Sequence, residues 1–443
     1  MKLKNKNILV IGLGKSGQAV VEFLINKGAS VIIFDDNKDK VYDVKIQYNV
    51  LSLDNYENLQ CVDFAVLSPG VSKYHEVVKQ CYLQNIKVIG ELEFASYFIK
   101  GTILALTGSN GKTTTVSLIK HIFDVNKKKS VLAGNIGTPL IKYANCVKRT
   151  YIIEVSSFQL ETSNLKPKIA GILNVSENHL DRHFSMKEYF ETKCKIFNRQ
   201  NQNEFLVLNY DDERLRNIKK ENIAPKIIWF SLTTTDCNAF IKDGYFCFKK
   251  DKKIIKIASI KDFKLLGQHN LSNCLCAICY AMISKIKVKF IKKAIKSFLP
   301  VEHRIEFVKC IKGINFINDS KSTTPKSTEI CVNSVVKPII LVLGGSDKGI
   351  DYHDMVSKIS PNIKLAILTG QIADKLKQAF DDNLKTNYIV EKNFFEALTL
   401  AYEKAEKGDS VVLSPATASF DMFKNFEQRG NVFKEFVKSL DEK

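Results

Sequence analysis

The chain has 443 residues, of which 45% are hydrophobic and 26% are charged. This composition is typical of a soluble globular protein and excludes a disordered, collagenous or membrane-spanning chain. The length allows several domains, since one domain usually takes about 100–200 residues. The apolar run behind Lys2, Lys4 and Lys6 is broken by Gly14-Lys15 and precedes no cleavage site for a signal peptidase, so we expect a cytoplasmic protein.

The chain is strongly basic, with 66 Lys and Arg against 47 Asp and Glu and a net charge of +19. Such a balance suits nucleic acid, an anionic membrane or phosphorylated substrates. The basic runs at 127–129 and 249–253 are short and interspersed with other residues, so a solvated Lys-rich surface is the simpler interpretation. We expect no nucleic-acid or membrane partner. The 11 irregularly spaced cysteines favour reduced thiols.

Short β-branched runs alternate with helical stretches along the whole chain, which is typical of parallel βαβ units. The first series predicts strands at 7–11, 30–34, 63–67 and 87–89. The second predicts strands at 102–106, 151–154, 169–175 and 205–209, and the third at 315–317, 338–343, 364–368 and 410–413. We therefore predict an α/β protein with domains at 1–98, 99–299 and 300–443, the last beginning at Pro300.

The glycine-rich segment Gly12 to Gly17 follows the first predicted strand, and Asp35 ends the second about 20 residues further on. This spacing matches the dinucleotide fingerprint and allows an NAD-dependent oxidoreductase. The same glycines and acid would equally hold another nucleoside diphosphate at a helix N-terminus. The loop Ser68-Pro69-Gly70 follows a neighbouring strand and is expected at the same crevice, although it also suits a simple turn.

The strongest local signal is the segment Thr107 to Thr114, TGSNGKTT, between an apolar strand and a helical run. Its glycines free backbone N–H groups for phosphate oxygens, Lys112 neutralises charge, and the hydroxyl of Thr113 can bind Mg²⁺. The first glycine of the Walker pattern would fall at Leu106, so the motif is incomplete. The strand–loop–helix setting favours ATP binding.

Two polar side chains stand where strands of the middle domain end. Glu154 closes one predicted strand, and His179 lies in a polar segment behind another. A carboxylate and an imidazole beside a phosphate loop could hold a second Mg²⁺ ion, although a lone His is more often structural. Lys193 lies in a helix whose start is marked by Ser185 and Glu188, and no local pattern distinguishes it from its neighbours.

Three loops of the last domain combine lysines with hydroxyls. They are 318–323, 344–349 and 414–419, and each follows a predicted strand. This composition suits a substrate with more than one carboxylate. By contrast, Cys274, Cys276 and Cys279 lack zinc spacing and are interpreted as buried residues of an apolar helix.

Taken together, these motifs resemble the Mur ligases. The resemblance covers the whole chain and is carried by the segments 12–17, 67–71, 107–114, 134–137, 154–161, 174–182, 267–270, 303–304, 318–323 and 414–430. The last, SPATASFDMFKNFEQRG, resembles the branch of the family that adds D-glutamate. The Asp-x-Pro-Arg motif of the diaminopimelate-adding branch and the His-His-Pro motif of the alanine-adding branch are absent.

The resemblance implies three domains: a Rossmann-like domain for a UDP-sugar, a central P-loop-type ATPase domain and a Rossmann-like domain for the amino acid. It implies an ATP-dependent, ADP-forming ligase of peptidoglycan synthesis that joins D-glutamate to UDP-N-acetylmuramoyl-L-alanine through an acyl phosphate. The small-molecule substrates would be the only partners, and we expect a monomer. An NAD enzyme would leave the Gly-Lys-Thr loop and the last domain unexplained.

The resemblance also assigns residues. For the UDP-sugar it implies Gly14, Lys15, Ser16, Asp35, Asp36, Ser68, Pro69, Gly70, Asn135, Ser156, Gln159 and His179. For ATP it implies Gly108, Ser109, Asn110, Gly111, Lys112, Thr113, Thr114, Asn270, Arg304 and Asp319. For D-glutamate it implies Lys321, Thr323, Lys348, Ser419, Phe420 and Phe426. For two Mg²⁺ sites it implies Thr113, Glu154, His179 and Lys193, with Lys112, His179 and Lys193 catalytic and Lys193 carbamylated by CO₂.

Asn178 stands where a relative has Asp, which bears on the surroundings of the metal site but not on the site itself. Another Mur ligase or a folylpolyglutamate synthetase is the nearest alternative, distinguished by the amino acid that it accepts. Because the three substrates would lie on three domains, we expect the last domain to close over the second, with the region of Pro300 as hinge.

Overall fold

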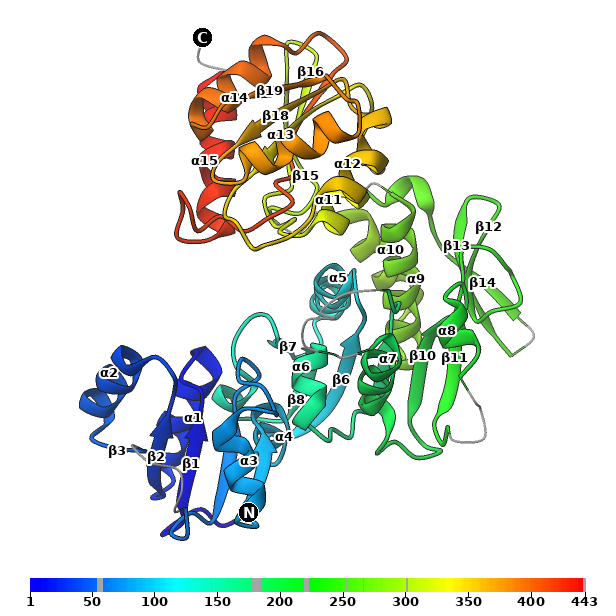
Figure 1. The fold of residues 1–443 in the computed structure, drawn as a ribbon. Coiled ribbons are helices and arrows are strands. Elements are labelled where there is room, and N and C mark those ends of the chain that lie inside the picture. The colour runs from blue at the N-terminus through cyan, green and yellow to red at the C-terminus, as the bar shows by residue number, and fades with distance from the viewer. Residues whose placement is uncertain are drawn as a thin grey trace. The chain divides into compact units, whose positions relative to one another are not determined.

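The computed structural model describes residues 1–53, 59–144, 146–176, 183, 185–218, 223–251, 253–265, 267–299 and 302–440. The chain divides into two compact units. Unit 1 comprises Met1–Phe263 and Leu271–Phe298, and unit 2 comprises Lys264–Asn270 and Leu299–Lys443. Figure 1 traces the elements of both units in chain order. The predicted hinge residue Pro300 lies outside the described residues.

Unit 1 begins with a five-stranded parallel sheet in the order β3-β2-β1-β4-β5. Successive residues of a strand point to opposite faces, and here both faces are buried. On β1, Ile8 and Val10 join one apolar cluster, whereas Leu9 and Ile11 join another. The strands are β1 (Asn7–Ile11), β2 (Ser30–Phe34), β3 (Leu51–Ser52), β4 (Phe64–Leu67) and β5 (Lys87–Gly90). The helices are α1 (Lys15–Asn26), α2 (Lys38–Tyr48), α3 (Glu76–Leu83) and α4 (Glu91–Ser96).

The rest of unit 1 is built on a nine-stranded sheet in the order β14-β13-β12-β11-β10-β9-β6-β8-β7. Its strands are β6 (Gly101–Thr107), β7 (Ser130–Gly134), β8 (Arg149–Glu154), β9 (Ile169–Ile172), β10 (Phe205–Asn209), β11 (Lys226–Phe230), β12 (Ala239–Lys242), β13 (Tyr245–Lys250) and β14 (Lys253–Ser259). Its helices are α5 (Lys112–Val125), α6 (Ser157–Thr162), α7 (Met186–Cys194), α8 (Glu213–Arg216), α9 (Gln268–Ile283) and α10 (Val288–Ser297). Single 3₁₀ turns lie at Leu140–Tyr143, Lys195–Phe197 and Ile260–Asp262.

Five strands of this sheet were not predicted: β7, β11, β12, β13 and β14. β12, β13 and β14 form an antiparallel meander. The turn between the first two is Asp243-Gly244, with φ angles of 51° and 74°. An Asp-Gly pair with two positive φ angles is typical of a tight hairpin, so the dipeptide was the available signal. The predicted strand 169–175 ends earlier, at Ile172, because the residues behind it turn to bond the 107–111 loop.

Unit 2 contains a six-stranded sheet in the order β15-β16-β20-β17-β18-β19, parallel except for the β15–β16 pair. Both faces of this sheet are buried by apolar clusters. Successive residues of β17 belong alternately to one cluster and to the other. The strands are β15 (Glu306–Ile311), β16 (Ile314–Asn318), β17 (Ile339–Gly344), β18 (Leu365–Thr369), β19 (Tyr388–Val390) and β20 (Ser410–Leu413). The helices are α11 (Pro325–Val332), α12 (His353–Ile359), α13 (Ala373–Asp382), α14 (Phe394–Glu403) and α15 (Phe426–Ser439), with a 3₁₀ turn at Ser360–Asn362.

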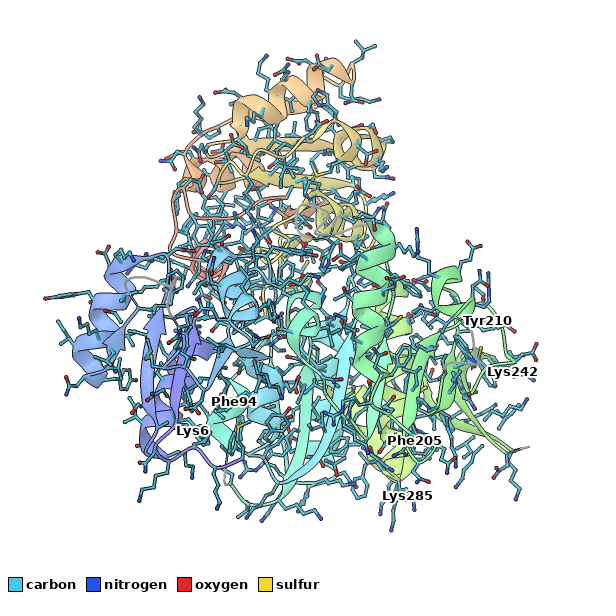
Figure 2. The ribbon with its side chains drawn as sticks, turned by 60° about the horizontal axis from the view of Figure 1, so that its bottom comes forward. Lys6, Phe94, Phe205, Tyr210, Lys242 and Lys285 are labelled. Carbon is cyan, nitrogen blue, oxygen red and sulfur yellow. The ribbon has the colours of Figure 1, made fainter. Side chains whose placement is uncertain are left out.

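Three mostly parallel sheets with helices between their strands confirm the predicted α/β class. The boundaries at 98 and 299 stay predictions. No helix in the described part of the chain is both long and apolar enough to cross a membrane. The positive charge is spread over many elements; in unit 1, for example, Lys6, Lys242 and Lys285 come from three separate segments (Figure 2).

The eleven cysteines are all free thiols. Cys274, Cys276 and Cys279 are fully buried on α9, which confirms their interpretation as core residues. Within the described ranges, no three His, Cys, Asp or Glu side chains are grouped so as to hold a metal ion. Only Cys61, in unit 1, and Cys310, in unit 2, are classed as exposed.

Candidate functional site

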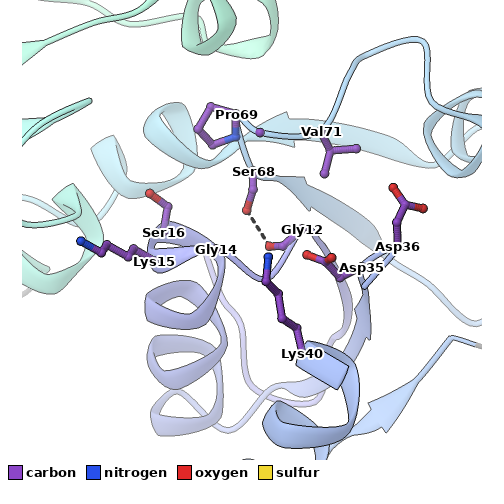
Figure 3. Close-up of a pocket in the computed structure, with 11 residues that line it drawn as sticks. Gly12, Gly14, Lys15, Ser16, Asp35, Asp36, Lys40, Ser68, Pro69 and Val71 are labelled. Atoms are coloured by element: carbon purple, nitrogen blue, oxygen red, sulfur yellow. Dashed lines mark hydrogen bonds between the residues drawn. The ribbon is translucent and has the colours of Figure 1, made fainter. Parts of the chain in front are cut away.

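A pocket of about 360 Å³ opens at the carboxyl ends of β1, β2 and β4. It is lined by Gly12, Gly14, Lys15, Ser16, Asp35, Asp36, Lys40, Ser68, Pro69, Gly70 and Val71 (Figure 3). All eight residues from Gly14 to Gly70 that were predicted to lie near the nucleotide are among them. Lys40 and Val71 were not predicted as site residues; Val71 ends the quoted segment 67–71, whereas Lys40 lies in none of the quoted segments.

The glycines of this pocket are required by close backbone contacts. A Cβ on Gly17 would lie 1.9 Å from the carbonyl oxygen of Gly12, so no side chain fits there. The hydroxyl of Ser68 donates a 2.7 Å hydrogen bond to the same oxygen, which ties the β1 loop to the β4 loop. Helix α1 therefore begins directly at the pocket, with its N-terminal N–H groups available to an anion.

Asp35 is used by the protein's own backbone. Its Oδ2 accepts a 2.7 Å hydrogen bond from Leu13 N, and its Oδ1 accepts one of 2.9 Å from Asn37 N. The carboxylate thereby fixes the glycine-rich turn relative to β2. Asp36 lies beside it and contacts Nε2 of His75 at 3.1 Å.

The 107–114 loop lies between β6 and α5 in the nine-stranded sheet. Gly108 and Gly111 have positive φ angles of 158° and 82°, which only glycine adopts without strain. The ammonium of Lys112 donates to the carbonyl oxygens of Gly108 at 2.7 Å and Ser109 at 2.9 Å. The loop thus carries its positive charge against its own backbone at the start of a 14-residue helix. This is the geometry expected of a phosphate-binding loop.

Residues that the sequence analysis did not single out hold this loop in place. Asn174 accepts from the backbone N–H of Asn110 at 2.8 Å and donates to its carbonyl oxygen at 3.1 Å. The hydroxyl of Ser109 donates to Ser176 O at 2.9 Å and lies 3.2 Å from the hydroxyl of Tyr189. Asn174 begins the polar segment behind β9, so its position at a strand end was a signal.

A buried polar cluster adjoins the loop at the end of β8. Glu154 is 1% exposed. Its Oε2 accepts a 2.9 Å hydrogen bond from the hydroxyl of Thr113, and its Oε1 accepts one of 2.8 Å from the amide of Asn135. β6 lies between β8 and β9 in the sheet, so the carboxyl ends of these three parallel strands lie side by side. Nearby on α6, Ser156 and Gln159 form a reciprocal capping box.

Lys193 reaches the phosphate loop from α7. Its ammonium is almost fully buried and donates to Gly108 O at 3.1 Å, and it lies 4.3 Å from the ring centre of Tyr189. Burial, together with the charge of Lys112, holds the pKa of this amine well below its usual value. Ser185 caps helix α7 as predicted, because its hydroxyl accepts a 3.1 Å hydrogen bond from the backbone N–H of Glu188. The Glu188 carboxylate contacts Lys73 Nζ at 3.1 Å. The predicted residue His179 lies outside the described residues.

In unit 2, Arg304 is presented by a strained segment. Its neighbours His303 and Ile305 have φ angles of 62° and 44°, in the left-handed region that a β-branched residue avoids. The backbone N–H of Ile305 donates to Oδ1 of Asp319 at 3.1 Å. Asp319 is buried, which raises the pKa of its carboxyl group against the effect of hydrogen bonds from hydroxyls such as that of Ser414.

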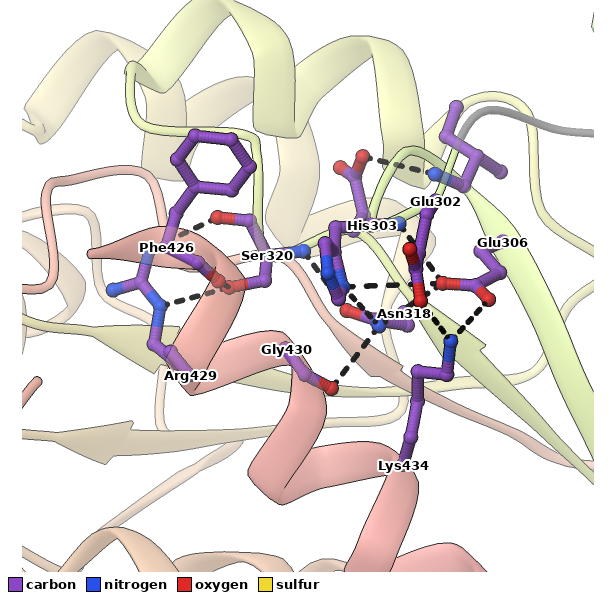
Figure 4. A network of polar contacts seen from close by, with 11 residues as sticks. Glu302, His303, Glu306, Asn318, Ser320, Phe426, Arg429, Gly430 and Lys434 are labelled. Atoms are coloured by element: carbon purple, nitrogen blue, oxygen red, sulfur yellow. Dashed lines mark hydrogen bonds and ion pairs between the residues drawn. The ribbon is translucent and has the colours of Figure 1, made fainter. Parts of the chain in front are cut away.

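A network of hydrogen bonds around His303 holds this strained backbone in place (Figure 4). Its backbone N–H donates to Glu306 Oε2 at 2.8 Å, and its Nδ1 lies 2.9 Å from the amide nitrogen of Asn318. That amide also donates to the carbonyl oxygen of Gly430 at 3.2 Å. A Cβ on Gly430 would lie 2.2 Å from His303 Nδ1, so glycine is needed for this approach.

The residues predicted for D-glutamate lie on loops of neighbouring strands in unit 2. β20 lies between β16 and β17, so the loops that follow these three strands leave the sheet side by side. The Lys321 ammonium lies 5.5 Å from the ring centre of Phe426. Burial, together with the charge of Arg429, lowers the pKa of Lys348. The Ser419 side chain is buried, and its hydroxyl has no hydrogen-bond partner among the described residues.

Two further residues complete this group. Thr323 N–H donates to Lys321 O at 2.9 Å, and Phe420 is 73% exposed. Asn270 is buried in the first turn of α9, and the segment Lys264–Asn270 that contains this turn is assigned to unit 2, whereas the rest of α9 belongs to unit 1. Arg429 was contained in a quoted motif but was not singled out as a functional residue.

Comparisons with known proteins bear on the whole chain. Three family models match: the Mur ligase MurD-like N-terminal domain over residues 6–90, the Mur ligase middle domain over 106–281, and the Mur ligase glutamate ligase domain over 303–417. A UDP-N-acetylmuramoylalanine--D-glutamate ligase of Caldanaerobacter subterraneus is 41% identical and aligns with 99% of this chain and 100% of its own. The chain belongs to the Mur ligase family.

A second relative of this Mur ligase, a UDP-N-acetylmuramoylalanine--D-glutamate ligase of Koribacter versatilis, is 36% identical over 100% of this chain and 99% of its own. Among solved structures, the MurF ligase of Thermotoga maritima in complex with ADP aligns with a TM-score of 0.62 at 16% identity. That alignment covers 98% of this chain and 96% of the other. At this identity the likeness concerns the fold, and it agrees with the expected three-domain Mur ligase architecture.

Proposed function

We propose that this Mur ligase joins D-glutamate to UDP-N-acetylmuramoyl-L-alanine with conversion of ATP to ADP and phosphate, as a step of peptidoglycan synthesis. The observation that carries the proposal is the full-length similarity, at 36–41% identity, to enzymes named for this reaction. The pocket at β1, the phosphate-type loop at β6 and the lysine-bearing loops of unit 2 each suit one of the three substrates.

The β1 pocket suits the UDP moiety. Its helix N-terminus would take the diphosphate, with Gly14, Lys15 and Ser16 at the first turn. Asp35 keeps that turn in place through Leu13, and Asp36 and the Ser68–Gly70 loop complete the wall. The competing use of this pocket for NAD leaves the loop at Lys112 without a role. Asn135, Ser156, Gln159 and His179 are proposed for the sugar and alanyl part.

The residues around Glu154 suit a divalent cation. A buried carboxylate in contact with the Thr113 hydroxyl offers the oxygen ligands that Mg²⁺ prefers. Thr113, Glu154 and His179 would hold the ions, and Mg²⁺ would neutralise charge on the transferred phosphoryl group. Lys112 adds a fixed positive charge at the loop, while Asn270, Arg304 and Asp319 are proposed to bind the rest of ATP.

The proposed reaction proceeds through an acyl phosphate. A carboxylate is a poor electrophile, so phosphorylation of the L-alanyl carboxylate by ATP supplies a leaving group. The chain's contribution is to align that carboxylate, the phosphate loop and the incoming amine in a site shielded from water. The amine of D-glutamate then displaces phosphate, and the residues proposed to bind D-glutamate are Lys321, Thr323, Lys348, Ser419, Phe420 and Phe426.

Lys193 is proposed to act as a carbamate. Its amine is buried beside Gly108 O, where a low dielectric favours the neutral form that can react with CO₂. The carbamate would add a second anionic oxygen group near Glu154 for Mg²⁺. We further propose a cytoplasmic monomer that acts on small molecules without a membrane or nucleic-acid partner. The domain limits at 98 and 299, and closure of the last domain about the region of Pro300, belong to the same proposal.

The test is ATP-dependent phosphate release with UDP-N-acetylmuramoyl-L-alanine and, in separate reactions, D-glutamate, L-glutamate, L-alanine or diaminopimelate. Release with D-glutamate alone is expected. Release with another amino acid would keep the ligase chemistry and overturn the amino-acid assignment. No release with any amino acid, together with tight binding of NAD, would overturn the proposal.

A further inference from the structure

Arg429 lies where the substrate-facing loops of unit 2 meet. It belongs to the first turn of α15 and is 1% exposed. Burial lowers the pKa of its guanidinium to about 10, although the Asp421 carboxylate acts in the opposite direction. The group therefore stays charged at neutral pH. A buried charge is tolerated only where polar groups surround it, so its contacts define what it does.

The guanidinium makes five hydrogen bonds, all to loops behind β16, β17 and β20 or to their strand ends. Nε donates to the hydroxyl of Ser320 at 3.1 Å, and Nη2 donates to the Ser320 carbonyl at 3.0 Å (Figure 4). Nη2 also donates to Thr417 O at 3.1 Å. Nη1 donates to Ala418 O at 3.1 Å and to Gly344 O at 3.4 Å.

These acceptors stand next to the residues proposed for D-glutamate. Ser320 precedes Lys321, and Ala418 precedes Ser419. Gly344 opens the loop that carries Lys348. The hydroxyl of Ser320 in turn donates to the carbonyl oxygen of Phe426 at 2.8 Å. One side chain thus fixes the spacing of three loops and of the helix start.

The close packing around the guanidinium leaves no room for other arrangements of the central loop. Gly345 has a φ angle of 144°, and a Cβ there would lie 2.2 Å from Ala418 O and 2.9 Å from Arg429 Nη1. The hydroxyl of Thr417 donates to Ser346 O at 2.6 Å. The β17 and β20 loops are therefore joined directly as well as through Arg429.

We propose that Arg429 is a positioning residue that preforms the amino-acid site by holding these three loops in one arrangement. The inference rests on the proposed function, because it assumes that these loops bind the amino-acid substrate. Guanidinium is suited to the task, since its five donors lie in one rigid plane and reach carbonyls on several sides. A preformed site avoids the cost of ordering loops when the substrate binds.

The first variant is Arg429→Lys, which keeps the charge and loses the planar donor set. We expect KM for D-glutamate to rise by about tenfold or more, equivalent to about 1.4 kcal/mol of binding free energy. KM for ATP and for the UDP-sugar substrate should change by less than about twofold. Ser320→Ala, which removes one of the five acceptors and is the milder change, should raise KM for D-glutamate in the same direction.

The control is Val437→Ala, a cavity-forming change in the buried face of the same helix. It should lower the melting temperature and leave KM for D-glutamate unchanged. Equal changes in all three KM values in Arg429→Lys, or an equal rise in KM for D-glutamate in Val437→Ala, would overturn the positioning role. Activity of the wild type with a different amino acid only would instead overturn the proposed function.

A measurement without substrate tests the positioning role separately from the proposed function. Amide hydrogen exchange should become faster in all three loops at once in Arg429→Lys, at 320–323, 345–349 and 414–419. Val437→Ala should not produce this pattern. Unchanged exchange in the three loops of Arg429→Lys would refute the preformed arrangement whatever the substrate is.

Discussion

The hydroxyl of Thr113 donates a 2.9 Å hydrogen bond to Glu154, a carboxylate at the end of the neighbouring strand β8. This contact links the first turn of the phosphate-type loop helix to the buried polar cluster of the sheet. A side chain at position 113 therefore serves two partners, the Glu154 carboxylate and the proposed Mg²⁺.

Replacing this hydroxyl tests the link. Thr113→Val keeps the shape of the side chain and leaves a buried carboxylate oxygen without its donor. We expect kcat to fall by about 100-fold, the upper end of the usual cost of losing a group that orients a metal site. Thr113→Ser keeps the hydroxyl and should retain most of the activity. Steady-state phosphate release at several Mg²⁺ concentrations measures both, and equal activities would contradict the assignment.

The Lys193 amine should be replaceable by a free carboxylate if it works as a carbamate. Lys193→Ala is expected to lose nearly all activity, because the cavity at Gly108 O then lacks the anionic group. Added formate or acetate should restore part of it at millimolar concentrations. Lys195→Ala, two positions away in the same segment, is the matched variant for rescue, and acetate should not increase its activity. A fully active Lys193→Ala enzyme would refute the carbamate.

Gly17 should be essential for nucleotide binding at the β1 pocket. Its Cβ position lies 1.9 Å from Gly12 O, so Gly17→Ala must displace the turn. We expect KM for the UDP-sugar substrate to rise by more than about tenfold while KM for ATP stays the same. Ala19→Gly weakens the same helix by about 1 kcal/mol without touching the pocket, and serves as the control. Isothermal titration with UDP should give the same ranking.

The buried carboxyl group of Glu91 should make the stability of the folded protein depend on pH. Burial raises the pKa of its carboxyl group to about 7 from 4.5, and its Oε1 has no hydrogen-bond partner among the described residues. The folded protein therefore holds this proton more tightly than the unfolded chain does. The stabilisation is complete below pH 4.5 and is lost as the pH rises through 7. The loss amounts to about 3 kcal/mol, since each pKa unit corresponds to about 1.4 kcal/mol.

Glu91→Gln removes this titration. At pH 5 the variant and the wild type should unfold at similar denaturant concentrations, whereas at pH 8 the variant should be more stable by an amount approaching that loss. Glu403→Gln, at the exposed end of α14, should follow the wild type at both values. A constant difference between Glu91→Gln and the wild type from pH 5 to pH 8 would show that the carboxyl group does not titrate in this range.

Most strands that carry functional loops could be predicted from the sequence because both signals are local, whereas β3, β7, β11, β15 and β19 were not predicted. The apolar run 7–11 and the glycines behind it mark β1 and its pocket without any tertiary information. The meander β12–β14 was missed even though Asp243-Gly244 marks its turn, because its lysines conceal the alternation of the strands. The pairing of the meander strands becomes evident only in the folded sheet of unit 1.

Other features depend on contacts between residues far apart in the chain. Asn174 lies 64 positions from Asn110, and Arg429 lies 109 positions from Ser320. No local pattern indicates such partners, since the sheet order alone brings the loops together. The same reason explains why Lys193 could be assigned only through a resemblance. Its environment is made by Gly108 and Tyr189 of the folded chain.

The distribution of cysteines allows a distance between the two units to be measured with labels on natural residues. Burial raises the pKa of several thiols strongly, to about 11 at Cys81 and about 12 at Cys194, so these react slowly with maleimides. Cys61 and Cys310 are exposed and belong to different units. Fluorophores or spin labels would therefore attach first to one natural site in each unit. A change of their separation on addition of ATP and both substrates would report the proposed closure in the unmutated enzyme.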